Sequence, residues 1–230
     1  MNLQQQRTLL RTQLLDMSRL SQRALDYSIK GYEFNRSEFS LHTGSIDRQL
    51  KCRYNQIKLL SRQLIITGVA DPSDFRFSSA AIRLNSAFYQ TYKAASRIAR
   101  ATTENNTIYK SAALVEFGNL TNDLVRLCTV TLFLGDARHA ETVLHSQAAW
   151  RLSELILQTS HSAEENADGT LAITQNLSVI VRQAHEMAEA LLFWLKGKDC
   201  VPSLSPRRSA LSHHYSARQQ NRTRPQLTAS

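Results

Sequence analysis

The segment His185-Glu186-Met187-Ala188-Glu189 carries the most suggestive spacing of chemical groups in this sequence, because it partly matches a zinc-protease helix. In that pattern two histidines one helical turn apart bind zinc, and the glutamate between them acts as a base. Here Glu189 stands in place of the second histidine, and no third ligand is recognisable. We therefore expect an ordinary helix flank beside a buried Met187.

The other histidines and cysteines form no recognisable site. His213 and His214 are adjacent in a polar segment, where two ligands alone do not make a metal site. Cys52, Cys128 and Cys200 are far apart and lack metal-ligand spacing. Three unpatterned cysteines are typical of a reducing compartment, so we expect a cytoplasmic protein. We expect Cys52 and Cys128 to be half-buried rather than reactive.

The sequence shows no enzyme chemistry. A di-iron bundle needs inward-facing glutamates and Glu-x-x-His pairs on four helices, whereas the helix seams here are apolar or small. No glycine-rich phosphate loop follows a strand, and no serine or cysteine has the setting of a nucleophile. We expect neither catalysis nor a bound cofactor. We also expect Trp150, Trp194, Phe193 and Tyr92 to serve in packing or in a partner groove.

The composition favours long helices. The 230 residues include 7 glycines and 4 prolines, and Pro72 is the only proline before residue 202. So few turn-forming residues argue against a sheet-rich fold. No apolar stretch approaches the 18 residues of a membrane span, and residues 1–16 lack the uninterrupted apolar stretch of a signal peptide.

Apolar residues recur every third or fourth position, which is the period of amphipathic helices. This period predicts six helices, over residues 10–29, 41–64, 75–99, 111–134, 137–159 and 170–196. Three helices followed by three more predict an all-α fold. We expect two similar three-helix bundles packed side by side, residues 1–105 and 106–200.

Particular residues predict where these helices end. Gly68 is expected to end the second helix. Asp71 is a suitable N-cap, with Pro72 at the first helical position. Gly135 either kinks or continues its helix, and Gly197 is a plausible C-cap.

Residues 201–230 form a basic tail that we expect to be disordered. The tail has five arginines and no acid, which leaves +4 of the total charge of +9 for the rest of the chain. It could contact nucleic acid or anionic lipid through non-specific charge, or it could be a solubilising appendage. An alternative function is therefore that of a basic helical protein that binds nucleic acid.

Short strings along the chain resemble the PhoU family of bacterial phosphate-signalling regulators. The third helix contains Asp74-Phe75-Arg76-Phe77, then Ala81-Ile82-Arg83-Leu84, and ends in Ser96-Arg97-Ile98-Ala99. The run from Met187 to Asp199 is similar to the family's closing pattern, an I-A-E run followed by an aromatic, an aliphatic and x-G-x-D. Leu134 to Val143 and Ile46-Asp47 resemble intermediate strings, so that the resemblance covers about residues 8–199.

The resemblance implies a regulatory adaptor rather than an enzyme. Family members restrain phosphate uptake and phosphate-starvation signalling. They act between a phosphate ABC transporter and a sensor histidine kinase, often as homodimers. By this resemblance the chain would act through protein–protein contacts, in which helix faces dock on a partner's cytoplasmic domain.

The acidic positions of the family are replaced in this chain. Family members bind iron or zinc clusters through acids on their third and sixth helices. Alignment places those acids on residues that are not carboxylates: Ala87, Tyr89, Lys93, Asn176, Ser178 and Arg182. Multivalent cations need several converging oxygen ligands, so we predict a divergent member without metal clusters. Lys93 and Arg182 could contact an anion or an acidic partner, or be ordinary solvated charges.

Overall fold

The computed structural model describes residues 2–67, 71–104, 111–160 and 167–197. All regular structure in these ranges is α-helical, which confirms the predicted all-α class. The helices are α1 (Leu3–Phe34), α2 (Ser37–Ser45), α3 (Asp47–Thr67), α4 (Pro72–Glu104), α5 (Ala112–Leu134), α6 (Ala137–His145), α7 (Ala148–Ser160) and α8 (Ala167–Lys196). The expectations for Gly68, for the boundary at 105 and 106, and for the tail concern positions outside the described residues.

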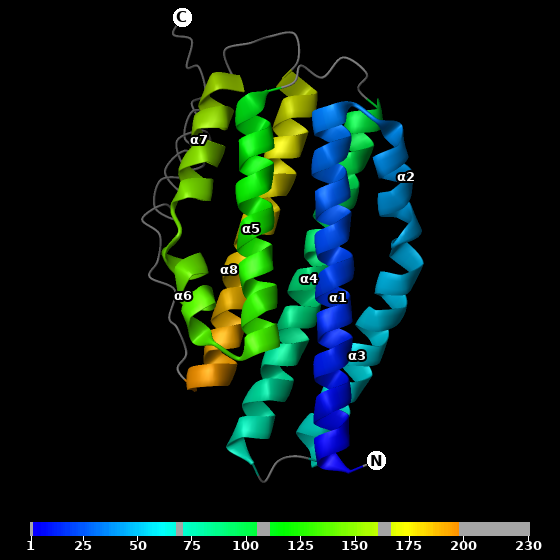
Figure 1. Cartoon of the computed structure of the whole chain (residues 1–230), viewed down its shortest axis with the longest axis vertical. Coiled ribbons are helices and arrows are strands. Elements are labelled where there is room, and N and C mark those ends of the chain that lie inside the picture. The colour runs from blue at the N-terminus through cyan, green and yellow to red at the C-terminus, as the bar shows by residue number, and fades with distance from the viewer. Residues whose placement is uncertain (1, 68–70, 105–110, 161–166, 198–230) are drawn as a thin grey trace, which may run out of the picture. The chain divides into compact units, whose positions relative to one another are not determined.

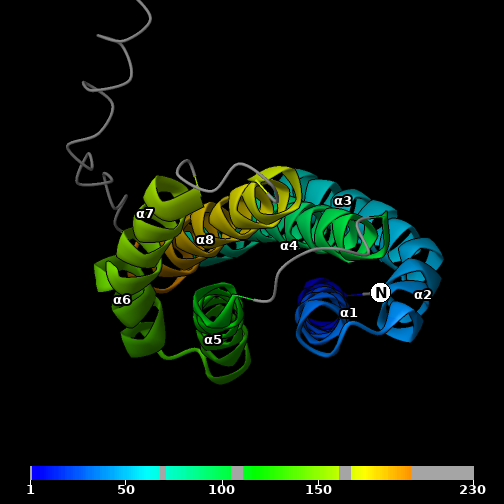
Figure 2. The same cartoon turned by 90° about the horizontal axis from the view of Figure 1, so that it is seen from above.

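The helices of residues Met1–Asp199 belong to one unit and lie in two layers. Most of them run along the same long axis (Figure 1). Seen from above, α7, α8, α4, α3 and α2 follow one curved layer, and α1 and α5 lie against its inner side (Figure 2). The helix α4 occupies the middle of the curved layer, where it contacts α8, α1 and α3. We call the opposite, solvent-facing side of this layer the outer face.

Small residues let α4 and α8 pack closely along their length. Both helices bury several alanines, and the distance between packed helices depends on the side chains at the contact. The buried alanines of at most 1% exposure are Ala80, Ala81, Ala87, Ala94 and Ala95 on α4, and Ala184, Ala188 and Ala190 on α8. The larger side chains that are fully buried include Phe88 of α4 and Leu14 and Met17 of α1.

Two of the six predicted helices are each broken in two, so the prediction of six was wrong. The second breaks at Ile46, between α2 and α3, and Ile46 is itself only 5% exposed. The fifth breaks after His145, where Ser146 has an extended ψ of 113°. Neither break contains glycine or proline, and the apolar period continues across both, so the sequence pattern gave no sign of them.

The helix ends predicted at Asp71 and Gly197 hold, whereas the expectation that Gly135 kinks or continues its helix is wrong, because Gly135 ends it. Its φ of 72° terminates α5, so the helix does not continue. Gly197 ends α8 with a φ of 66°, and its N–H donates to Phe193 O at 3.0 Å. Asp71 precedes Pro72, the first residue of α4, and its Oδ1 accepts from the Ser73 N–H at 2.8 Å.

Within the described ranges, no helix has both the length and the apolar character that crossing a bilayer requires.

Candidate functional site

The six positions that replace the family's acids differ widely in exposure. Ala87 is 1% exposed and belongs to the core. Tyr89, Asn176 and Ser178 are half-buried. Lys93 and Arg182 are exposed. These two cations alone therefore present charge to the surroundings from the six positions.

Lys93 belongs to a polar and aromatic cluster between α4 and α3. Its Nζ lies 4.8 Å from the centroid of the Tyr89 ring, which in turn lies 4.8 Å from the Tyr54 ring of α3. The hydrogen bond from Lys51 holds the pKa of Asp47 below its usual value, and the charge of Lys93 lowers it further. Lys93 thus stacks on a ring and compensates an acid.

On α8, the corresponding polar side chains bind their own helix or α7. The Asn176 Nδ2 donates to Ala172 O at 2.7 Å. The Ser178 hydroxyl donates to Thr174 O at 2.9 Å and lies 2.7 Å from the Ser153 hydroxyl of α7. These groups serve helix packing, so among the three replaced positions on α8 only Arg182 presents a charge.

The structure brings Lys93 and Arg182 to the same outer face. The antiparallel register of α4 and α8 can be read from Arg83, whose Nη2 lies 3.1 Å from Glu189 Oε2. Counting seven residues along each helix from that pair places Arg182 level with Gln90, which is three residues, or about one helical turn, from Lys93. Both side chains are exposed on this face. Two cations on neighbouring helices can act together on an acidic partner.

The zinc-protease-like segment is a helix flank, as expected. Met187 is fully buried. The His185 ring packs 5.8 Å from the Trp150 ring of α7, and its Nδ1 lies 2.9 Å from Val181 O. Within the described ranges, no three His, Cys, Asp or Glu side chains are grouped closely enough to hold a metal ion.

Neither described cysteine is half-buried, so that expectation was wrong. Cys52 is exposed, whereas Cys128 is buried between α5 and α8, where its Sγ–H donates to Ala184 O at 3.4 Å. Burial raises the pKa of the Cys128 thiol to about 12. Of these two thiols, Cys52 is the reactive one, because the thiolate is the nucleophile and Cys128 stays protonated.

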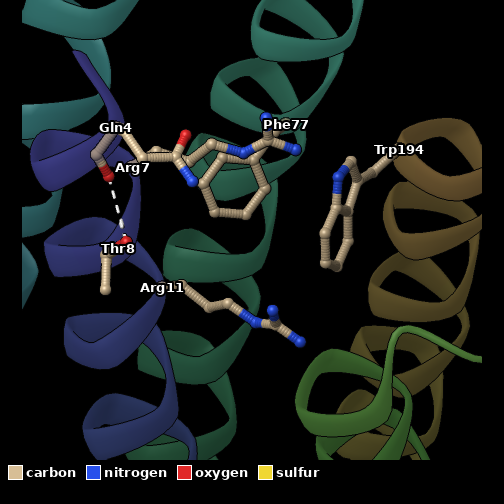
Figure 3. A pocket seen from close by; sticks show the side chains of 6 residues that line it. All are labelled: Gln4, Arg7, Thr8, Arg11, Phe77 and Trp194. Carbon is tan, nitrogen blue, oxygen red and sulfur yellow. Dashed lines mark hydrogen bonds between the residues drawn. The ribbon is translucent and has the colours of Figure 1, made fainter.

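A pocket of about 330 Å³ opens at one end of α1, α4 and α8. Figure 3 shows that α1 contributes Gln4, Arg7, Thr8 and Arg11 to its wall, while Phe77 comes from α4 and Trp194 from α8. Neither arginine stood out from the local sequence pattern. Arg7 and Arg11 are far from Phe77 and Trp194 along the chain, so the sequence does not indicate that these residues line one pocket.

The polar groups of this pocket already have protein partners. Arg7 Nη1 lies 2.8 Å from Asp74 Oδ1, and the Arg7 guanidinium lies 5.6 Å from the Phe77 ring. Arg11 Nη2 donates to the carbonyls of Leu132 and Phe133 at 3.2 and 2.9 Å, where the C-terminal end of α5 favours a cation. These contacts join α1 to α4 and α5, so the pocket is built mainly for packing.

No family model and no curated protein matches the sequence. Among solved structures, the "phosphate transport system regulatory protein PhoU" of Streptococcus pneumoniae matches with a TM-score of 0.75 at 17% identity, over 86% of this chain and 99% of that one. PhoU of Pseudomonas aeruginosa matches with a TM-score of 0.78 at 16% identity, over 86% and 100%. Matches at this identity concern the fold, and they confirm that this chain has a PhoU-like fold.

Proposed function

We propose that this protein is a cytoplasmic regulatory adaptor of phosphate homeostasis, which restrains phosphate uptake and phosphate-starvation signalling. The observation that carries the proposal is the PhoU-like fold, which extends over 86% of this chain and nearly all of each solved neighbour. One of those neighbours is a phosphate transport system regulatory protein. Fold alone does not specify function, so the proposal also needs a surface that can bind a partner.

The outer face of α4 and α8 supplies that surface. It carries Lys93 and Arg182, and it exposes Phe75 and Ile82 of α4 to 48% and 39%. Exposed apolar side chains beside fixed cations suit a partner whose docking segment is both apolar and acidic. We propose as partners the cytoplasmic parts of a phosphate ABC transporter and a sensor histidine kinase, with the adaptor acting as a homodimer.

In this proposal the adaptor works without the metal clusters that the resemblance to the PhoU family would imply. Lys93 and Arg182 place positive charge where a cluster would need carboxylates, so attachment to the partner depends on the side chains themselves. Elemental analysis of the purified protein tests this part. Stoichiometric iron or zinc would contradict it.

Deletion of the gene in its native host tests the function. External phosphatase activity in phosphate-replete medium should rise, because the restraint on the starvation response is lost. Complementation with the double variant Lys93→Ala and Arg182→Ala should leave the activity high. A matched control that removes two exposed charges elsewhere, Arg62→Ala on α3 and Arg126→Ala on α5, should restore the low activity. Unchanged phosphatase activity after deletion would overturn the proposal.

A further inference from the structure

A second hollow, of about 690 Å³, lies between the antiparallel helices α1 and α3. Its walls include Arg19 and Arg23 from α1 and Arg48 and Arg53 from α3, and we call it the arginine groove. Asp16 and Cys52 also line it.

Positive charge in the arginine groove exceeds what the protein compensates. Among the described residues that line it, four arginines meet one aspartate, which leaves a net charge of +3. That aspartate lies 3.9 Å from Arg19 Nη1 and 3.5 Å from Arg53 Nη2, so it is shared between two cations. By contrast, Arg83 on α4 has Glu189 at 3.1 Å.

This concentration of charge opposes folding and therefore calls for an explanation. Arg19 and Arg23 are four residues apart on α1, and like charges at that spacing repel. The antiparallel packing of α3 brings two further arginines to the same groove. A bound anion would relieve the repulsion, because the guanidinium fork matches the oxygens of phosphate groups.

Neighbouring groups hold part of the arginine set in place. Arg53 Nη1 donates to Gln13 Oε1 at 2.5 Å. Arg23 Nη2 lies 3.3 Å from the Tyr27 hydroxyl, and its guanidinium lies 5.9 Å from the Tyr27 ring. Such contacts reduce the side-chain entropy lost when a ligand binds. The volume of about 690 Å³ lies within the range of small-molecule sites.

We propose that the arginine groove binds a small anion that carries two or more phosphate groups. Arg19 and Arg23 are separated by about 6 Å of helix rise, and the axes of packed helices are about 8–10 Å apart. One phosphate group cannot reach cations spread over both distances, whereas a chain of phosphates can. Inorganic oligophosphates and nucleoside polyphosphates share this chemistry. The inference is independent of the regulatory function proposed above, since binding is measured on the purified protein.

Protection of Cys52 from alkylation tests the inference on the full chain. Cys128 is fully buried, and the background substitution Cys200→Ser removes the thiol that lies outside the described residues, so Cys52 is the thiol that reacts. Iodoacetamide is neutral and is not drawn to the arginines. At matched ionic strength, tripolyphosphate, pyrophosphate and ATP should slow the alkylation at least fivefold, and orthophosphate should slow it less than twofold.

The nucleotide arm distinguishes the two sources of the ligand. Equal protection by ATP and tripolyphosphate would show that the groove binds only the phosphate chain of the ligand. Stronger protection by ATP would show that the base also binds. Either result supports the proposal. Absence of protection by all three polyphosphates would overturn it, and so would protection by only duplex DNA or an acidic peptide.

A charge-matched pair of variants separates a specific site from general attraction. Arg23→Gln with Arg48→Gln should raise the Kd for tripolyphosphate at least tenfold by calorimetry. Arg62→Gln with Arg97→Gln removes the same charge from exposed positions outside the groove and should change the Kd less than twofold. Circular dichroism and the urea midpoint establish that both pairs are folded. Equal weakening in both pairs would overturn the proposal.

Discussion

The rings of Phe77 and Trp194 lie 5.0 Å apart at an interplanar angle of 52°. Phe77 belongs to the string that opens α4, and Trp194 belongs to the string that closes α8. Beside them, a Cβ at Gly197 would lie 3.6 Å from the Arg76 side chain. Two of the strings that resemble the PhoU family therefore meet at one end of the bundle. Their residue types are explained there by packing between helices.

Removal of the Trp194 ring should destabilise the fold. We expect Trp194→Ala to lower the free energy of unfolding by about 2–4 kcal/mol, because the half-buried ring contacts Phe77 and Arg11. Trp150→Ala is the matched control, since Trp150 is 39% exposed and should cost about 1 kcal/mol or less. Urea unfolding measures both. Equal losses would show that the contact with Phe77 contributes nothing particular.

The ion pair between Arg7 and Asp74 should be strongly coupled. Asp74 is only 7% exposed, so its carboxylate depends on the Arg7 guanidinium at 2.8 Å. A double-mutant cycle with Arg7→Met and Asp74→Leu should give a coupling energy of about 1–2 kcal/mol. The same cycle for the exposed pair Arg126 and Asp123 should give about 0.5 kcal/mol or less. A smaller value for the buried pair would contradict this account of the pocket.

Two glycine substitutions should have opposite effects on stability. Gly135 has a φ of 72°, a conformation that strains any L side chain, so Gly135→Ala should destabilise by about 1 kcal/mol. Gly44 lies in α2, and a Cβ there would meet nothing within 4 Å. Gly44→Ala should stabilise by up to about 1 kcal/mol because alanine favours a helix. Thermal unfolding measures both signs, and a destabilising Gly44→Ala would contradict the placement of that residue.

Alkaline pH should weaken the fold partly through Tyr92. Burial, and then the negative charge of Asp47, raise the pKa of Tyr92 above its ordinary value of 10.0. The unfolded chain therefore ionises first, and the stability contributed by Tyr92 is present below pH 10 and is lost as the pH rises further. The phenol also donates to Asp47 Oδ1 at 3.1 Å.

Tyr92→Phe tests this pH dependence. The variant should be about 1 kcal/mol less stable at pH 7, because it lacks the hydrogen bond to Asp47. It should lose less stability than the parent between pH 9 and pH 11, as measured by urea unfolding. Tyr32, whose pKa is also raised by burial, is present in both proteins and cancels in the comparison. Identical losses in the two proteins would contradict the assignment.

The helical nature of the chain and several helix ends could be predicted from local signals. Pro72 begins α4 as expected, because its fixed φ suits a first helical turn. Gly197 ends α8 as expected, because glycine adopts a positive φ without strain. The breaks at Ile46 and Ser146 could not be predicted, because neither falls on a glycine or a proline.

The sequence by itself determined the amphipathic helices, since their period depends only on neighbours three and four residues away. Only the tertiary structure decided which faces meet. It buried Ala87 while exposing Lys93 on the same helix, and it gathered Arg19 and Arg48 into one groove from separate helices. The physical reason is that such associations depend on the register and direction of packed helices. Those are set by side-chain packing across the whole bundle, which no local pattern encodes.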